Sequence, residues 1–146
     1  MSRKLIKDVE PEAFKAVLGM EQYIRKSSLP KKLCELIKIR ASQLNGCAYC
    51  LDMHTQEGIK EGEDIRRLFA IAAWHESPLF TEEERHVLQL TEEVTLIGEQ
   101  GVTDDTYDAV LNAFGEKGIA QIIMQIIIIN TWNRMAVACQ QVYEGE

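Results

Sequence analysis

The chain has 146 residues, of which 46% are hydrophobic and 27% are charged, and its formal net charge is −7. This length suits one ordinary domain that can bury a core without disulfide staples. The negative charge disfavours nucleic acid and anionic membrane surfaces as partners, because both repel an acidic protein.

In chain order, seven helical segments and no convincing strand are predicted, so we expect an all-α, single-domain helical bundle over residues 1–146. Pro11 and Pro30 suit the first turns of the first two helices, and Asn45-Gly46 breaks the second. Thr81 begins a capping sequence for the fifth helix. The expected helices cover residues 11–25, 30–44, 47–62, 63–74, 82–100 and 104–114, and the last runs from a turn at 115–118 almost to the C-terminus.

The last helix contains an isoleucine-rich run at residues 122–129, and β-branched residues favour strands. The residues on both sides continue without a turn signal, so one long helix is the simpler interpretation. Such a helix is apolar nearly all round and must be covered on every side. In a domain this small, we expect another subunit to supply part of that cover. The chain is therefore predicted to be a homo-oligomer, with an oligomerisation helix at about residues 116–143.

The cellular location bears on the four cysteines of the chain. The N-terminal residues lead into no apolar stretch of signal-peptide length, and the run at 122–129 is far too short to span a bilayer. We therefore expect a cytoplasmic protein with no membrane partner. Cysteines in the cytoplasm are reduced unless they do redox or metal chemistry. Cys34 and Cys139 stand alone in apolar helical patterns and are expected to be buried small hydrophobes.

The other two cysteines, Cys47 and Cys50, form a Cys-x-x-Cys motif. With His54 they occupy offsets i, i+3 and i+7, which share one helix face with Leu51 and Gly58. Both cysteines fall in the first turn, where free N–H groups and the helix dipole stabilise a thiolate. His54 lies one turn after Cys50, within reach of a proton transfer. The two cysteines are close enough to form a disulfide.

Glu35, in the second helix, is the fourth candidate residue. Leu36 and Ile37 beside it are poor surroundings for a carboxylate, and a buried carboxylate needs a partner. The expected partner is His54, directly or through a water, so that the pair acts as a relay for a thiol proton. Taken singly, a glutamate is more often solvated and a histidine more often a hydrogen-bonded core residue. The joint pattern Glu-x11-Cys-x2-Cys-x3-His is much harder to obtain by chance.

Zinc binding is the main alternative, since Cys47, Cys50, His54 and Glu35 could supply four ligands. Structural zinc sites usually combine two separated pairs of ligands, and the sequence contains no second cluster of Cys and His. A cysteine hydrolase is a weaker alternative, because it leaves the second cysteine unexplained. The pattern therefore favours dithiol chemistry.

The stretch from Glu35 to Thr55 closely resembles the core of the alkylhydroperoxidase D-like proteins of the carboxymuconolactone decarboxylase family. The later stretch 130–136, Asn-Thr-Trp-Asn-Arg-Met-Ala, resembles that family's C-terminal helix. The resemblance spans about residues 12–140, with a motif core at about 12–100. It implies an all-helical oligomer, commonly a trimer or hexamer, with no tightly bound cofactor.

The resemblance further implies a thiol-dependent peroxidase. Cys50 matches the cysteine that attacks the peroxide and becomes a sulfenic acid, and Cys47 matches the proton donor and resolving cysteine. Glu35 and His54 match the proton relay. The substrate would be a hydroperoxide, and the reductant an external dithiol or protein, for which the resemblance suggests a lipoyl group.

One position departs from the family. Some members have a histidine immediately before the second cysteine, where this chain has Tyr49. The departure removes one potential proton carrier and leaves the dithiol intact. Two alternatives therefore stay open: a thiol–disulfide exchange or redox-sensing protein with little peroxidase turnover, and a non-catalytic zinc-binding or scaffold protein.

Overall fold

The computed structural model describes residues 2–143, which form an all-helical single domain, as predicted. No helix within this range is both long and apolar enough to cross a membrane. The helices are α1 (Ile6–Val9), α2 (Pro11–Arg25), α3 (Lys31–Asn45), α4 (Ala48–Lys60), α5 (Ile65–Ala70), the 3-10 helix η1 (Ile71–Ala73), α6 (Glu82–Thr95), α7 (Ile97–Gln100) and α8 (Asp104–Ala138).

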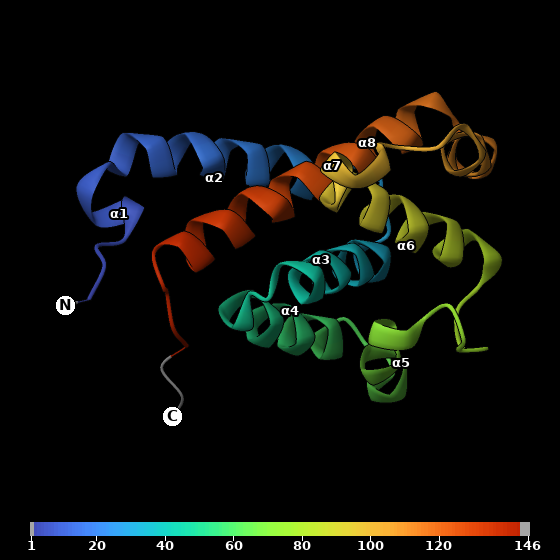
Figure 1. Cartoon of the computed structure of the whole chain (residues 1–146), viewed down its shortest axis with the longest axis horizontal. Coiled ribbons are helices and arrows are strands. Elements are labelled where there is room, and N and C mark those ends of the chain that lie inside the picture. Colours follow the sequence, from blue (N-terminus) through green and yellow to red (C-terminus); the bar gives the residue numbers. More distant parts are fainter. Residues whose placement is uncertain (1, 144–146) are drawn as a thin grey trace.

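The central helix of the domain is α3, which packs against α4, α6 and α8 (Figure 1). On the other side of α8 lies α2, and α1 packs against α2. The bounds of α2, α3 and α4 agree with the predicted ones to within two residues. Thr81 forms the predicted capping box with Glu84 at the start of α6. The helices that carry the candidate site are thus the best-predicted ones.

Three segments differ from the prediction. Residues 6–9 form α1, which was not predicted because four residues are too few to show a helical period. The helix expected at 63–74 begins later, because the Asp64 carboxylate accepts a hydrogen bond from the Arg66 N–H at 2.8 Å and caps α5. The helix expected at 82–100 breaks at Leu96. Glu93, in α6 before that break, accepts a hydrogen bond from the Thr103 N–H at 2.9 Å, which ties the start of α8 back to α6.

Within α8, Gly115 has φ 74° and ψ 175°, a backbone conformation that favours glycine. The label α8 therefore covers two helical parts that meet at a kink at Gly115, the first residue of the predicted turn at 115–118. The isoleucine-rich run is helical, as expected. The kink follows from the backbone freedom of glycine at position 115. The helical run follows from flanking residues that carry no turn signal.

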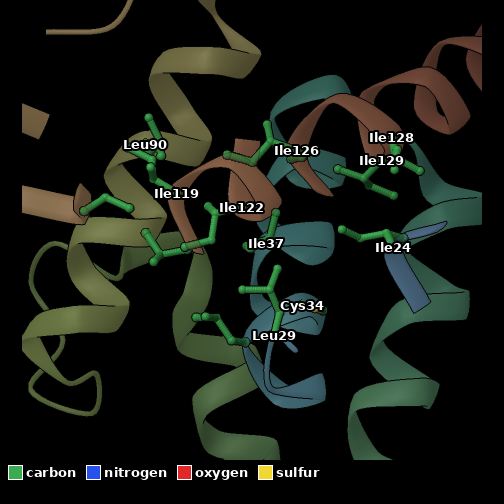
Figure 2. Packing of buried hydrophobic residues seen from close by; sticks show 14 residues of the cluster. Ile24, Leu29, Cys34, Ile37, Leu90, Ile119, Ile122, Ile126, Ile128 and Ile129 are labelled. Carbon is green, nitrogen blue, oxygen red and sulfur yellow. The ribbon is translucent and has the colours of Figure 1, made fainter. Parts of the chain in front are cut away.

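Buried aliphatic side chains hold α3, α6 and α8 together (Figure 2). Ile37, Leu90, Ile122 and Ile126 are 0% exposed. Full burial of such a side chain stabilises a fold by about 1.5–3 kcal/mol. The chain itself thus supplies much of the cover for α8 that was expected from a second subunit. Ile127 is 39% exposed, and the homo-oligomer stays a prediction.

Candidate redox site

The junction between α3 and α4 places the two motif cysteines. Gly46 ends α3 with φ 64°, in the left-handed region, and the Cys47 N–H donates to the Ser42 carbonyl at 3.0 Å. Cys47 is then the N-cap of α4, and its sulfur accepts a hydrogen bond from the Cys50 N–H at 3.3 Å. Cys47 and Cys50 form a disulfide, with their Cα atoms 5.3 Å apart. The helix N-terminus is thus directed at the sulfur pair.

A buried polar network fixes this junction to α8. Asn45 donates hydrogen bonds from Nδ2 to Oδ1 of Asn130 at 2.9 Å and to Oδ1 of Asn133 at 3.0 Å. Asn133 is 0% exposed, and its own amide donates to Ser42 Oγ at 3.0 Å. Such a network is stabilising because each buried polar group finds a partner. It connects the Asn-Thr-Trp-Asn-Arg stretch of α8 to the residue before Gly46.

One turn after Cys50, His54 is buried between two carboxylates. Its Nδ1 lies 3.4 Å from Glu35 Oε2 on α3 and 2.9 Å from Glu57 Oε2 on α4. The structure therefore brings Glu35 and His54 together as expected. It also adds Glu57, which the sequence analysis missed although its i+3 spacing from His54 was visible.

Lys38 balances the charge of the buried Glu35. Its ammonium donates to Glu35 Oε1 at 2.9 Å, and the two side chains are only 12% and 7% exposed. Glu35 Oε2 forms no hydrogen bond with any residue in the described range 2–143, and it lies 3.4 Å from Nδ1 of His54. Lys38 was also missed, and again an i, i+3 spacing, here from Glu35, was the available signal.

These contacts shift the protonation equilibria of the cluster. Burial disfavours the imidazolium of His54, but Glu35 and Glu57 outweigh it and raise the pKa of His54 above its usual value. The hydrogen bond from His54 lowers the pKa of Glu57. Burial likewise disfavours the ammonium of Lys38, but Glu35 raises the pKa of Lys38. These contacts therefore favour the charged forms of His54, Glu57 and Lys38.

A cavity of about 230 Å³ opens onto the sulfur pair. Of the two disulfide cysteines, Cys50 is the one that lines it, beside His54 and Glu57. The walls are largely apolar and come from α1, α2, α4 and the C-terminal half of α8; they include Phe14, Leu18, Met53, Ile129, Trp132 and Met135. A small organic molecule can therefore reach Cys50 from one side.

The two remaining cysteines differ from each other. Cys34 is buried, as expected, and burial raises its pKa to about 11. Cys139 is only half-buried and lines the cavity, so the expectation of a buried hydrophobe is wrong for this residue. The reason is its place at the C-terminal cap of α8, where the helix leaves the core.

The ligand atoms of Glu35, His54 and Glu57 lie within 4.8 Å of one another, which would also suit a shared cation. The Lys38 ammonium already supplies a positive charge to Glu35, and His54 is hydrogen-bonded to Glu57. We therefore interpret the cluster as a hydrogen-bonded relay. Because the structure pairs Cys47 with Cys50, the alternative of zinc binding would require the reduced pair.

The structure thus combines an all-helical domain with a disulfide-bonded Cys-x-x-Cys at the N-terminus of α4. The model of the carboxymuconolactone decarboxylase family matches residues 11–93. This chain belongs to that family. A Bacillus subtilis relative, the uncharacterized protein YdfG, is 40% identical over 131 residues, covering 90% of this chain and 89% of YdfG.

Solved structures show the same fold. A protein of unknown function from Agrobacterium tumefaciens, described as a candidate antioxidant-defence protein AhpD, matches with a TM-score of 0.96 and 39% identity over 100% of both chains. The debrominase Bmp8, solved with 2,3,4-tribromopyrrole, has a TM-score of 0.84 and 19% identity, over 94% of this chain and 74% of that one. At that identity the likeness shows the fold alone.

Proposed function

We propose that this protein is a thiol-dependent peroxidase that cycles between a Cys47–Cys50 dithiol and disulfide. The observation that carries the proposal is the position of Cys50, which lies at the N-terminus of α4, faces the cavity and stands one turn from His54. A helix N-terminus and a nearby imidazole both favour the thiolate, which is the reactive form of cysteine. The Agrobacterium protein described as AhpD-like supports the same assignment.

The cycle begins when His54, oriented by Glu35, accepts a proton from the reduced pair. The Cys50 thiolate attacks the peroxide, so that an S–O bond forms, the O–O bond breaks, and the alkoxide leaves as an alcohol with a proton from the relay. Cys47 then attacks the sulfur of the Cys50 sulfenic acid. An S–S bond forms and hydroxide leaves as water. An external dithiol returns two electrons by exchange and restores both thiols.

The reductant must be narrow enough to reach the two buried sulfur atoms. Cys47 is 1% exposed and Cys50 is 3% exposed, so the surface of a folded protein cannot reach the disulfide. A small dithiol, or one on a long arm such as a lipoyl group, fits the cavity. The same burial disfavours general exchange with protein disulfides. No bound cofactor is needed, and we also propose that the protein acts as a homo-oligomer, a trimer or hexamer.

The test is peroxide consumption by the purified protein with a dithiol reductant. Cys50→Ser should abolish turnover, and Cys47→Ser should stop the cycle at the Cys50 sulfenic acid, which a dimedone probe detects. Full activity in Cys50→Ser would contradict the assignment. Elemental analysis separates the zinc alternative, because stoichiometric zinc in the purified protein would favour a metal site over a working dithiol.

A further inference from the structure

Glu57 differs from the rest of the relay in its contact with solvent. Its side chain is 40% exposed, whereas those of His54 and Glu35 are 11% and 7% exposed. Glu57 also makes the closer of the two carboxylate contacts with Nδ1 of His54, at 2.9 Å against 3.4 Å for Glu35. Of the two carboxylates beside His54, Glu57 is therefore the one that also contacts solvent.

The contacts fix which nitrogen of His54 carries a hydrogen. An ionised carboxylate can only accept, so Nδ1 between Glu57 and Glu35 must be a donor. In the neutral ring, Nε2 is then the basic nitrogen. We propose that Glu57 is a positioning residue that holds this tautomer of His54 and is the solvent end of the proton relay. This role rests on the proposed function of the site.

In the proposed step, Nε2 of His54 takes the proton of the Cys50 thiol, and the thiolate forms. The imidazolium then releases the Nδ1 proton to the Glu57 carboxylate, which passes it to water. When Nε2 gives its proton to the leaving oxygen, Glu57 returns a proton from water to Nδ1 and restores the first tautomer. Glu35, paired with Lys38, holds the other side of the ring. One proton leaves the thiol and one reaches solvent, so no oxidant or reductant is required.

Several other charged or titratable groups face this cluster across the cavity. On α2, the charges of Arg25 and Glu21 offset each other, since Arg25 Nε lies 3.4 Å from Glu21 Oε1. Of the two carboxylates that line the cavity, Glu21 and Glu57, Glu57 is thus the one in direct contact with His54. The groups lining the same space are Lys7 of α1, Glu21 and Arg25 of α2, Lys38 of α3, Tyr49 and Cys50 of α4, and Cys139 at the end of α8.

The test is an NMR titration of His54 in the reduced protein, with ring-labelled histidine and His54→Gln to assign the signal. In Glu57→Gln the pKa of His54 should fall by about half a unit to one unit, because one anionic partner of a partly exposed pair is lost. The Nδ1-protonated tautomer should also become less dominant. Glu57→Asp should recover part of both effects.

A second readout is the pH profile of Cys50 alkylation, which should move with His54 and slow by about three- to tenfold near neutral pH in Glu57→Gln. Glu61→Gln is the matched control, because Glu61 lies at the end of α4 and is paired only loosely with Lys31, at 3.8 Å. It should change neither readout. An unchanged His54 titration, or an unchanged alkylation profile, in a folded Glu57→Gln protein overturns the proposal.

Neither readout uses a peroxide. If both move as expected and peroxide turnover is absent, the role of Glu57 stands and the peroxidase assignment fails. If turnover is present and Glu57→Gln moves neither readout, the peroxidase assignment stands and the role of Glu57 fails.

Discussion

Glu35 Oε2 on α3 lies 3.4 Å from Nδ1 of His54 on α4. This contact joins two helices that meet at the redox motif. The other oxygen of the Glu35 carboxylate accepts a hydrogen bond from the Lys38 ammonium. Glu35 therefore has two buried partners, the Lys38 ammonium and the His54 imidazole, and the removal of its charge affects both.

Glu35→Gln should destabilise the fold as well as slow the reaction. The amide leaves the Lys38 ammonium without a compensating charge at a site where its side chain is 12% exposed. The expected loss is about 1–3 kcal/mol in the free energy of unfolding, measured by urea denaturation. The control Glu61→Gln should cost about 0.5 kcal/mol or less, because a loose surface pair contributes little. Equal stability of the two variants would argue against the buried pair.

The stability of the protein should depend on pH through His54. Its pKa is raised in the folded state by Glu35 and Glu57 despite burial. The extra stability is therefore fully present below about pH 6.5, the unfolded value, and is lost as the pH rises through the folded pKa. Urea unfolding of the wild type and His54→Gln between pH 5.5 and 9 checks this. A stability difference that grows with pH would have the wrong sign.

Asn133→Ala should weaken the attachment of α8 to the α3–α4 junction. The substitution leaves the amide of Asn45 and the hydroxyl of Ser42 short of a partner in a buried network. We expect a loss of about 1–3 kcal/mol in urea denaturation. Thr131→Ala is the control, since the Thr131 hydroxyl donates a hydrogen bond within its own helix, to the Ile127 carbonyl at 2.9 Å. A comparable loss in both variants would assign the effect to the helix and not to the network.

Cys34 should stay unmodified when the reduced protein is alkylated. Burial raises its pKa to about 11, so at pH 8 only about one thiol in a thousand is a thiolate. Cys50, at a helix N-terminus and facing the cavity, should react first. Peptide mass spectrometry after brief iodoacetamide treatment gives the order of modification. Labelling of Cys34 before Cys50 would mean that the thiol of Cys50 is not activated.

The sequence predicted the motif helix well, because offsets of i, i+3 and i+7 define one face whatever the surroundings. It also located the break at Gly46. The partners Lys38 and Glu57 were missed, since many exposed helices carry the same i, i+3 charges and only their contacts with the buried Glu35 and His54 distinguish these two. Asn133 could be placed on a helix by resemblance, but its contact with Asn45 depends on packing between distant segments. Packing between distant segments also explains why α3 and α6 of the same chain bury so much of the apolar surface of α8.

The central claim is that a peroxide converts the reduced pair into the Cys47–Cys50 disulfide through Cys50. The most direct measurement mixes fully reduced protein with one equivalent of an organic hydroperoxide and follows peroxide loss and thiol state together in a stopped-flow and quenched mass-spectrometry experiment. We predict one disulfide formed for each peroxide consumed, with Cys47→Ser stopping at the Cys50 sulfenic acid. Peroxide loss at the wild-type rate in Cys50→Ser, or no disulfide in the wild type, would contradict the account.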